Sequence, residues 1–255
     1  MPVLIAPDAL GRALRAPAVA AAIALGLERA GITAVDLCPV SSGGPGTIEV
    51  LLPALGGETA DGFCLIEDGA TAIVEPGRSG AVTGARVAAA IEAGAGVIVL
   101  AAAGVAGAEA GAEGADTDGD TARALQRTGG LRGASLVVLS ALRSPAASSG
   151  PWAQLGARVV AGAPFVLTAL GFDERMRAAR AVVAGEASLD AATLRGGVAG
   201  EIATRARQSG VPCHAVVGAN RADRFEARIL DLQAIGEATT LAEIETAAEA
   251  LAQHV

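Results

Sequence analysis

The order of apolar segments in the first 55 residues limits the possible folds more than any other feature. An aliphatic run at residues 3–6 is followed by Ala, Val, Ile and Leu at helical spacing over 16–30, and then by a second aliphatic run over 32–40. Strand, helix and strand patterns in this order predict a βαβ unit with parallel strands and a right-handed crossover. The sequence therefore predicts an α/β protein built on a parallel sheet.

The later segments continue the alternation of strands and helices. A hairpin is expected where two short apolar runs flank the turn Glu67-Asp68-Gly69. The Ala/Gly tract 101–114 predicts a loop or a loose helix, and 148–156 a loop that holds Trp152. Further strands are expected at 63–66, 71–75, 96–100, 134–140, 181–184 and 213–217, and further helices at 48–55, 82–93, 121–127, 165–173, 200–209 and 241–253.

The apolar residues are almost all aliphatic, since 52% of the 255 residues are hydrophobic and only 2% are aromatic. This length suffices for one large or two modest domains. Strands that are covered on both faces, as in parallel α/β sheets, have such aliphatic compositions. A net charge of −8 argues against a nucleic-acid surface, which needs clustered positive charge.

The chain contains no lysine. Any phosphate group would therefore be bound by Arg, by backbone N–H groups or through a metal ion. The chain has three cysteines, Cys38, Cys64 and Cys213, and no two of them are spaced as in a metal-binding motif. They are predicted to be buried hydrophobic residues and not part of a zinc site. His214 lies in an apolar run and is predicted to be a core histidine with satisfied ring nitrogens; His254 is in the tail.

No apolar run has the length of a membrane span, and the N-terminus has no signal-peptide pattern. We expect a cytoplasmic protein without membrane contact. The acidic residues Asp116, Asp118 and Asp120 alternate like those of a Ca²⁺ loop, but the distal Glu is absent. A turn and an N-cap for the helix over 121–127 are the preferred interpretation.

Residues 182–197 form the segment around which the chain is organised. An apolar strand leads into Gly185-Glu186, and Asp190 and Thr193 follow where the next helix begins. In open α/β sheets, ligands bind outside the carboxyl ends of the strands, so this junction is a candidate site. Asp190 and Thr193 could equally serve only as helix caps.

Three segments resemble the type I glycerate kinases. The first has the pattern Gly185-Glu186-x-x-Leu189-Asp190-x-x-Thr193-Leu194-Arg195-Gly196, where the family commonly has Gly-Glu-Gly-Arg-Leu-Asp-Ser-Gln-Thr-Leu-Arg-Gly-Lys. The opening run Val3-Leu4-Ile5-Ala6-Pro7-Asp8 is similar to the family's first strand and turn. The segment Ser42-Gly43-Gly44-Pro45-Gly46-Thr47 resembles its Asp-Gly-Gly-Glu-Gly-Thr turn.

The resemblance implies a flavodoxin-like or Rossmann-like parallel-sheet domain into which a second, smaller α/β domain is inserted. Carried over, residues 1–57 and 165–255 would form the outer domain and 58–164 a shortened insert. The implied reaction is phosphoryl transfer from ATP, with Mg²⁺, to D-glycerate or another small acid. A homodimer is a possible assembly.

The resemblance also supplies candidate site residues. Asp8 and Asp190 match catalytic positions. Substrate or nucleotide binding is carried over to Arg12, Ser42, Gly43, Gly44, Asp118, Glu186, Thr193 and Arg195, and no residue is assigned to a metal.

Several charged positions of the family pattern are replaced in this chain, whereas its turn glycines persist. The replacements are Gly11 and Gly197 for Lys, Ser42 for Asp, Pro45 for Glu, Ala141 for Asp, Ser144 for Asn and Ser188 for Arg. Loss of such preorganised groups predicts weakened or lost catalysis. Two alternatives stay open: a non-catalytic relative that binds a nucleotide or small acid, and a site rebuilt around Arg12, Arg143 and Arg195 for another anion.

Overall fold

The computed structural model describes residues 1–103, 118–127, 129–141 and 150–255, with the exception of the side chains of residues 118, 150 and 151. The chain divides into two compact units. Unit 1 comprises residues 1–41 and 167–255, and unit 2 comprises 42–166. Residues 42–57, which were expected with the outer domain, belong to unit 2, because helix α2 (Thr47–Leu55) contacts two strands of that unit's sheet.

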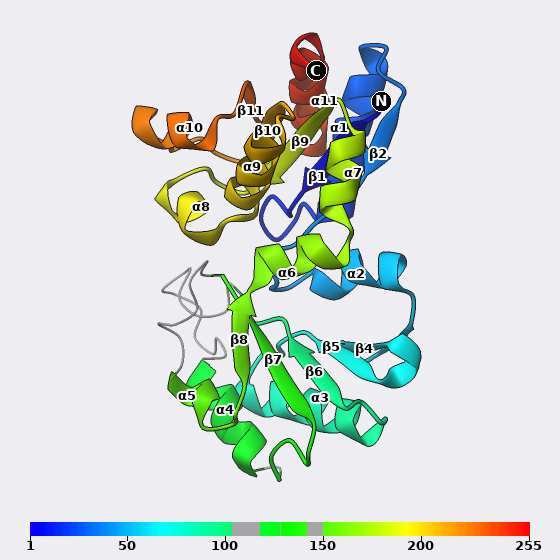
Figure 1. Cartoon of the computed structure of the whole chain (residues 1–255), viewed down its shortest axis with the longest axis vertical. Coiled ribbons are helices and arrows are strands. Elements are labelled where there is room, and N and C mark those ends of the chain that lie inside the picture. Colours follow the sequence, from blue (N-terminus) through cyan, green and yellow to red (C-terminus); the bar gives the residue numbers. More distant parts are fainter. Residues whose placement is uncertain (104–117, 128, 142–149) are drawn as a thin grey trace. The chain divides into compact units, whose positions relative to one another are not determined.

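Unit 1 contains a five-stranded parallel sheet, as predicted (Figure 1). Its strands are β1 (Val3–Pro7), β2 (Val35–Leu37), β9 (Ala181–Glu186), β10 (Cys213–Val217) and β11 (Ile235–Glu237). They lie in the order β2-β1-β9-β10-β11. Counted along unit 1 alone, this is the order 2-1-3-4-5 of flavodoxin-like folds.

Helices cover both faces of this sheet. On one face, α1 (Ala16–Arg29) and α11 (Leu241–Leu251) pack together over Val3 and Ile5, with Ile23 and Ile244 in the shared core. On the other face, α9 (Val198–Ser209) contacts β9 and β10, and α7 (Phe172–Ala178) contacts α9. The short helices α8 (Ala191–Gly196), α10 (Arg224–Leu230) and η3 (Ala252–His254) complete the unit.

Unit 2 contains a six-stranded mixed sheet in the order β3-β4-β5-β6-β7-β8. Its first three strands are antiparallel, and β5 to β8 are parallel. The β4–β5 pair is the predicted hairpin, closed by the short helix η1 (Glu67–Gly69). The strands are β3 (Glu58–Ala60), β4 (Phe63–Ile66), β5 (Thr71–Val74), β6 (Val97–Leu100), β7 (Ser135–Ser140) and β8 (Arg158–Ala161).

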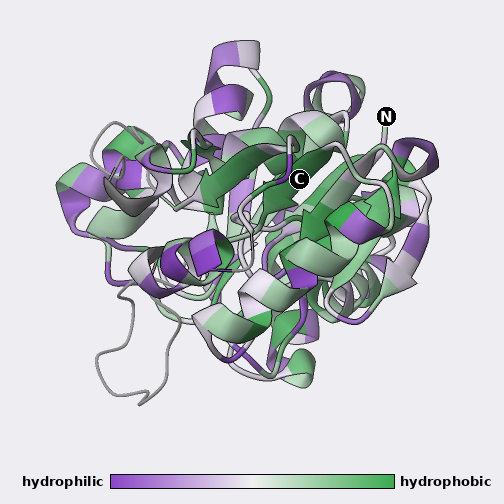
Figure 2. Ribbon diagram, turned by 90° about the horizontal axis from the view of Figure 1, so that it is seen from below, coloured by the Kyte–Doolittle hydropathy of each residue, from purple (hydrophilic) through white to green (hydrophobic). Residues whose placement is uncertain are grey.

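One core of unit 2 lies between this sheet and the helices α3 (Gly80–Glu92) and α4 (Asp118–Arg127). Trp152 joins it from the short helix α5 (Gly150–Ala153), where a loop was expected, and its side chain is 1% exposed. The strands of both sheets are predominantly hydrophobic, whereas hydrophilic residues concentrate on helices and turns (Figure 2). The aliphatic core predicted from composition is therefore present in each unit.

The single helix expected over 165–173 is two helices, α6 (Gly162–Ala169) and α7. Gly171 separates them because it adopts a left-handed conformation, with φ of 63°. Such a residue ends a regular helix, and glycine adopts the conformation without steric cost.

The buried cysteines fit the sequence prediction, since Cys38, Cys64 and Cys213 are free and buried. The prediction for His214 is confirmed for its burial but is wrong for its hydrogen bonds. The side chain is completely buried, but neither ring nitrogen has a hydrogen-bond partner among the described residues. Its ring instead stacks on that of His254, with 6.5 Å between centroids. Within the described ranges, no helix combines the length and apolarity that crossing a membrane requires.

Candidate functional site

The switch point of the unit 1 sheet lies between β1 and β9. The next strand after β1 in this sheet, β2, lies on one side of the pair, and the next strand after β9, β10, lies on the other side. Ligands of open α/β sheets bind at such points, outside the carboxyl ends of the strands. Pro7 pairs with Gly185, and the N–H of Asp8 donates to the carbonyl of Gly185 at 2.9 Å. Asp8 and Glu186 are therefore neighbours at this position.

Glu186 is held in an unusual environment for a carboxyl group. Its atom Oε2 is buried and has no hydrogen-bond partner in the part of the chain that the structure describes. The Thr193 hydroxyl and the N–H groups of Val198 and Ala199, at the start of α9, favour the ionised form, but burial and the charge of Asp8 oppose it. Burial first, and then Asp8, raise the pKa of Glu186 to about 8.

Gly197 provides the space for this carboxyl group. A methyl group at Gly197 would collide with Oε1 of Glu186, and would lie 2.7 Å from Cα of Thr193. The backbone of Gly197 has φ of −61°, which any residue can adopt, so the close approach alone favours glycine here. Where the family pattern has Lys, this chain therefore has a residue that admits Glu186.

The segment after β9 is fixed by backbone pairing and by a helix cap. Leu189 accepts a hydrogen bond from Arg221 N–H at 2.8 Å and donates one to the carbonyl of Ala219 at 2.9 Å. Asp190 is the N-cap of α8 and accepts from Ala192 N–H at 2.7 Å. The Thr193 hydroxyl accepts from Asp190 N–H and donates to the carbonyl of Ser188, each at 3.2 Å.

Asp190 and Thr193 thus form a capping box, which is the cap interpretation of the sequence pattern. The second carboxylate oxygen of Asp190 accepts from the Ser188 hydroxyl at 3.2 Å. Arg12 and Arg195 are exposed in the same unit. Both guanidinium groups are therefore accessible to an anion in solution.

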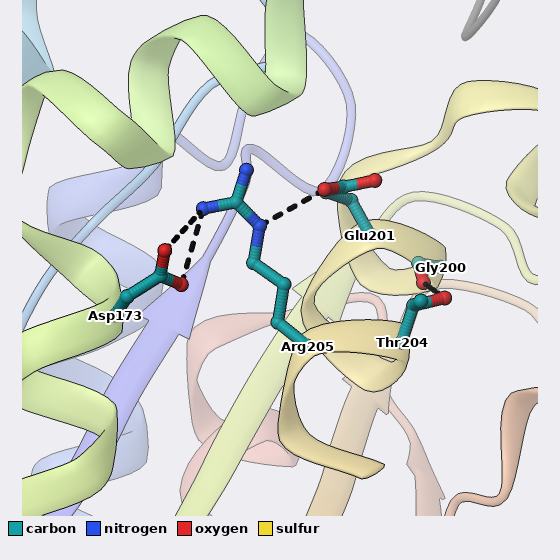
Figure 3. Close-up of polar contacts among 5 residues, drawn as sticks. All are labelled: Asp173, Gly200, Glu201, Thr204 and Arg205. Atoms are coloured by element: carbon teal, nitrogen blue, oxygen red, sulfur yellow. Dashed lines mark hydrogen bonds and ion pairs between the residues drawn. The ribbon is translucent and has the colours of Figure 1, made fainter. Parts of the chain in front are cut away.

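An ion-pair bridge anchors helix α9 (Figure 3). The start of this helix faces Glu186. Arg205 donates from Nη1 to both carboxylate oxygens of Asp173 on α7, at 3.1 and 3.2 Å. Its Nε donates to Glu201 of α9 at 2.9 Å. The Thr204 hydroxyl donates to the carbonyl of Gly200 at 2.7 Å. The pair between Arg205 and Asp173 therefore joins α9 to α7 on one face of the sheet.

The glycine-rich turn at residues 42–46 lies in unit 2 and leads into α2. Gly43 and Gly46 have φ of 88° and 95°, and a methyl group on Gly44 would collide with the carbonyl of Ala103. Glu75, just after β5, accepts from the N–H groups of Gly46 and Ile48 at 2.9 and 3.0 Å. A carboxylate of this chain therefore occupies donors at the N-terminus of α2.

The candidate residues thus form two groups, one in each unit. Asp8, Glu186, Asp190 and Thr193 belong to unit 1, with the exposed Arg12 and Arg195, whereas Ser42, Gly43 and Gly44 belong to unit 2. The side chain of Asp118 and all of Arg143 lie outside the described residues, as do 104–114 of the Ala/Gly tract.

Sequence reasoning missed Glu75 and the role of Gly197. An acidic residue directly after an apolar strand was the available signal for Glu75, whereas Asp8 and Glu186 were named from the family resemblance. In the part of the chain that the structure describes, no three His, Cys, Asp or Glu side chains are grouped so as to hold a metal ion.

A groove of about 590 Å³ lies elsewhere in unit 1, between β11 and α11. Its lining includes Ile235, Glu237, Ala247 and His254, and none of the candidate site residues. It borders the edge strand of the sheet, whereas the candidate site lies at the switch point. We therefore base the functional assignment on the strand ends.

The glycerate kinase family model matches residues 3–76 and 146–255. Among solved structures, the crystal structure of a "putative glycerate kinase 2" from Salmonella typhimurium LT2 is similar over 100% of this chain and 98% of that chain. The TM-score is 0.68 at 18% sequence identity, which shows a common fold. No curated protein matches the sequence. The match to the family model covers most of the chain, which belongs to the glycerate kinase family.

Proposed function

We propose that the protein transfers a phosphoryl group from ATP to D-glycerate or a closely related small hydroxy acid, with weakened catalysis. The observation that carries this proposal is the position of Asp8 and Glu186 at the switch point of a flavodoxin-like sheet in a member of this family. Because ligands bind outside the carboxyl ends of such strands, the acid acceptor is assigned to this end of unit 1.

The residues of unit 1 supply two parts of this chemistry. Asp8 is partly exposed, and we assign it to orient the acceptor hydroxyl and to receive its proton. Arg12 and Arg195 are exposed guanidinium groups that can bind a carboxylate or phosphate in a bidentate manner. Mg²⁺ bound to ATP would neutralise phosphate charge.

Two features support weakened catalysis. Neutral residues stand at several positions that are charged in the family pattern, including Gly11, Ser42 and Gly197. Glu75 accepts hydrogen bonds from the N–H groups of Gly46 and Ile48, which would otherwise be donors for a phosphate. A nucleotide phosphate at this turn would have to displace a carboxylate.

The arrangement at Glu75 also favours a second candidate function, a non-catalytic protein that binds a small acid through unit 1. Such a protein needs the strand ends of β1 and β9 but no phosphate site at the α2 turn. The two functions differ in their requirement for ATP: the kinase forms phosphoglycerate, whereas the binding protein retains the acid without turnover.

The deciding experiment incubates the purified protein with Mg²⁺, γ-labelled ATP and D-glycerate, and measures labelled phosphoglycerate. The kinase assignment predicts product that Asp8→Asn reduces by about a hundredfold or more, because proton acceptance and orientation are both lost. Glu174→Gln, which removes one charge from an exposed position on α7, is the matched control. If product is absent while calorimetry detects D-glycerate binding, the non-catalytic function is correct.

A further inference from the structure

Two acidic residues, Asp8 and Glu186, occupy adjacent positions at the switch point, and each residue as a whole is partly exposed. Asp8 is partly exposed, and its Oδ1 accepts from Ala9 N–H at 2.7 Å. Glu186 points its carboxyl group towards the start of α9, and its Oε2 is shielded from solvent, with no hydrogen-bond partner among the described residues. The register of β1 against β9 places both groups one residue beyond the Pro7–Gly185 pair.

The groups around Glu186 come from four elements. The end of β1 contributes Asp8, whose charge acts on Glu186, and β10 contributes backbone, since Gly218 N–H donates to the Glu186 carbonyl at 3.1 Å. Helix α8 contributes the Thr193 hydroxyl, and α9 the first N–H groups of a 12-residue helix.

The other charged groups on these elements are engaged or exposed. The carboxylate of Asp190 is bound to Ala192 N–H and the Ser188 hydroxyl. Glu201 and Arg205 of α9 pair with each other, and Arg205 also binds Asp173 (Figure 3). Arg195 of α8 is exposed. Asp8 is thus the charge that bears most directly on Glu186.

Two adjacent carboxyl groups, of which one has an oxygen shielded from solvent, do not both ionise readily. The second negative charge would be created beside the first and away from water, so one proton stays bound to the pair. This agrees with the raised pKa of Glu186, for which burial is the larger cause and Asp8 the second. A protonated carboxyl group has an O–H donor, which gives the shielded oxygen a means of making a hydrogen bond.

We propose that Asp8 and Glu186 hold one proton between them at neutral pH, and that this acid pair sets the upper pH limit at which unit 1 binds an anionic small acid. With the proton bound, the pair carries a single negative charge. When the proton is released to solvent, the pair carries two, and an anionic ligand at the same strand ends is repelled. The ligand part of this inference rests on the proposed function, whereas the shared proton does not.

The shared proton is tested on the protein without ligand. Glutamate side chains are labelled with ¹³C at the carboxyl carbon, and the Glu186 resonance is identified by its absence in Glu186→Gln. Its chemical shift is then followed with pH. We expect a midpoint near pH 8, as the raised pKa requires, and a lower midpoint in Asp8→Asn, which removes the neighbouring charge. A midpoint in the ordinary range of glutamate, or one that Asp8→Asn leaves unchanged, would overturn the acid pair.

The ligand part is tested by calorimetric titration with D-glycerate at pH 6.5 and pH 9. We expect binding to weaken about tenfold at the higher pH in the natural protein, because a second charge is added near the ligand. Glu186→Gln keeps the size of the side chain but has no proton to lose, so its affinity should stay nearly constant. Glu174→Gln, the exposed control, should retain the tenfold change.

The two experiments separate the inference from the proposed function. If D-glycerate does not bind at either pH, the proposed function fails, and the ¹³C titration alone decides whether the pair shares a proton. If D-glycerate binds equally at both pH values while Glu186 titrates near pH 8, the ligand does not sense the pair, and the pH limit that we propose is wrong.

Discussion

Glu186 in unit 1 and Glu75 in unit 2 both lie at the end of a strand and face the N-terminus of a helix. They differ in their hydrogen bonds and in the charges around them. Glu75 accepts two backbone hydrogen bonds, from Gly46 and Ile48. Glu186 faces the start of α9, but one of its oxygens is shielded and has no hydrogen-bond partner within the described ranges, and Asp8 lies beside it. A helix N-terminus favours a carboxylate by only about 0.3–1 kcal/mol, so burial and a neighbouring charge can outweigh it.

The two glutamates therefore have different roles. Glu75 behaves as a structural substitute for an anion, since it satisfies donors that a helix N-terminus leaves open. Glu186 lies next to the proposed acid site, and an ionised carboxyl group in its shielded position has a cost in stability that a neutral one avoids. The predictions below test this difference, from the largest expected effect to the smallest.

The largest effect is expected from Glu186→Gln, measured as the free energy of unfolding in urea across pH. A raised pKa in the folded protein means that the natural protein is most stable below the unfolded-state pKa of about 4.5, and that it loses stability as the pH rises to about 8. Above pH 8 the variant should therefore be the more stable, by roughly 3–5 kcal/mol at most. Near pH 4 the two proteins should be similar.

Glu174→Gln controls for the general effect of removing one negative charge from a chain of net charge −8. If both variants gain the same stability at high pH, the loss comes from overall repulsion and not from the position of Glu186.

The second prediction concerns Glu75→Ala, which leaves two N–H groups of the α2 turn without their acceptor. We expect a loss of about 1–2 kcal/mol in stability, since this is the usual cost of removing a helix cap with charged hydrogen bonds. Glu75→Gln, which retains an acceptor oxygen, should lose less. The alanine variant should also bind inorganic phosphate more tightly than the natural protein, as measured by calorimetry. Equal phosphate affinity would mean that Glu75 does not occupy an anion site.

The third prediction separates the two interpretations of Asp190. Asp190→Ala removes the N-cap of α8 and should cost about 1 kcal/mol, whereas Asp190→Asn keeps a capping oxygen and should cost a few tenths. If Asp190 only caps the helix, the asparagine variant should bind D-glycerate as the natural protein does. A loss of affinity in the asparagine variant without a loss of stability would show that its charge serves the ligand.

The sequence was sufficient for the elements with strong patterns but not for the short ones. Strands β1, β9 and β10 are aliphatic runs that are almost entirely buried, which is the pattern that predicted them. Strands β3 and β11 have only three residues each, without a fully buried position, so no periodicity identifies them. Helix α10 exposes Phe225 by 71%, which runs against an amphipathic pattern.

The same limit applies to the candidate site. Asp8, Glu186 and the cap at Asp190 could be named from strand ends and from the resemblance. Asp8 and Glu186 are neighbours only because β1 and β9 lie side by side in the sheet. This proximity affects the charge state of the pair. The hydrogen bonds of Glu75 depend likewise on the packing of α2 against β4 and β5, which no local pattern encodes.

The smallest effect is expected from Arg205→Met, which removes the ion-pair bridge between α7 and α9 (Figure 3). Asp173 is 46% exposed, so solvent screens its pair with Arg205, and the loss of stability should be at most about 1 kcal/mol. Arg207→Met, which removes an exposed hydrogen bond from the same helix to the carbonyl of Ile229, is the matched control. Neither variant should shift the ¹³C titration of Glu186, because Gly197 N–H still donates a backbone hydrogen bond of 3.1 Å to Thr193, which joins α8 to the start of α9.

A shift in Arg205→Met alone would mean that the bridge, and not the local backbone, positions the start of α9 against Glu186. The difference between Glu186 and Glu75 would then extend to how each helix is anchored.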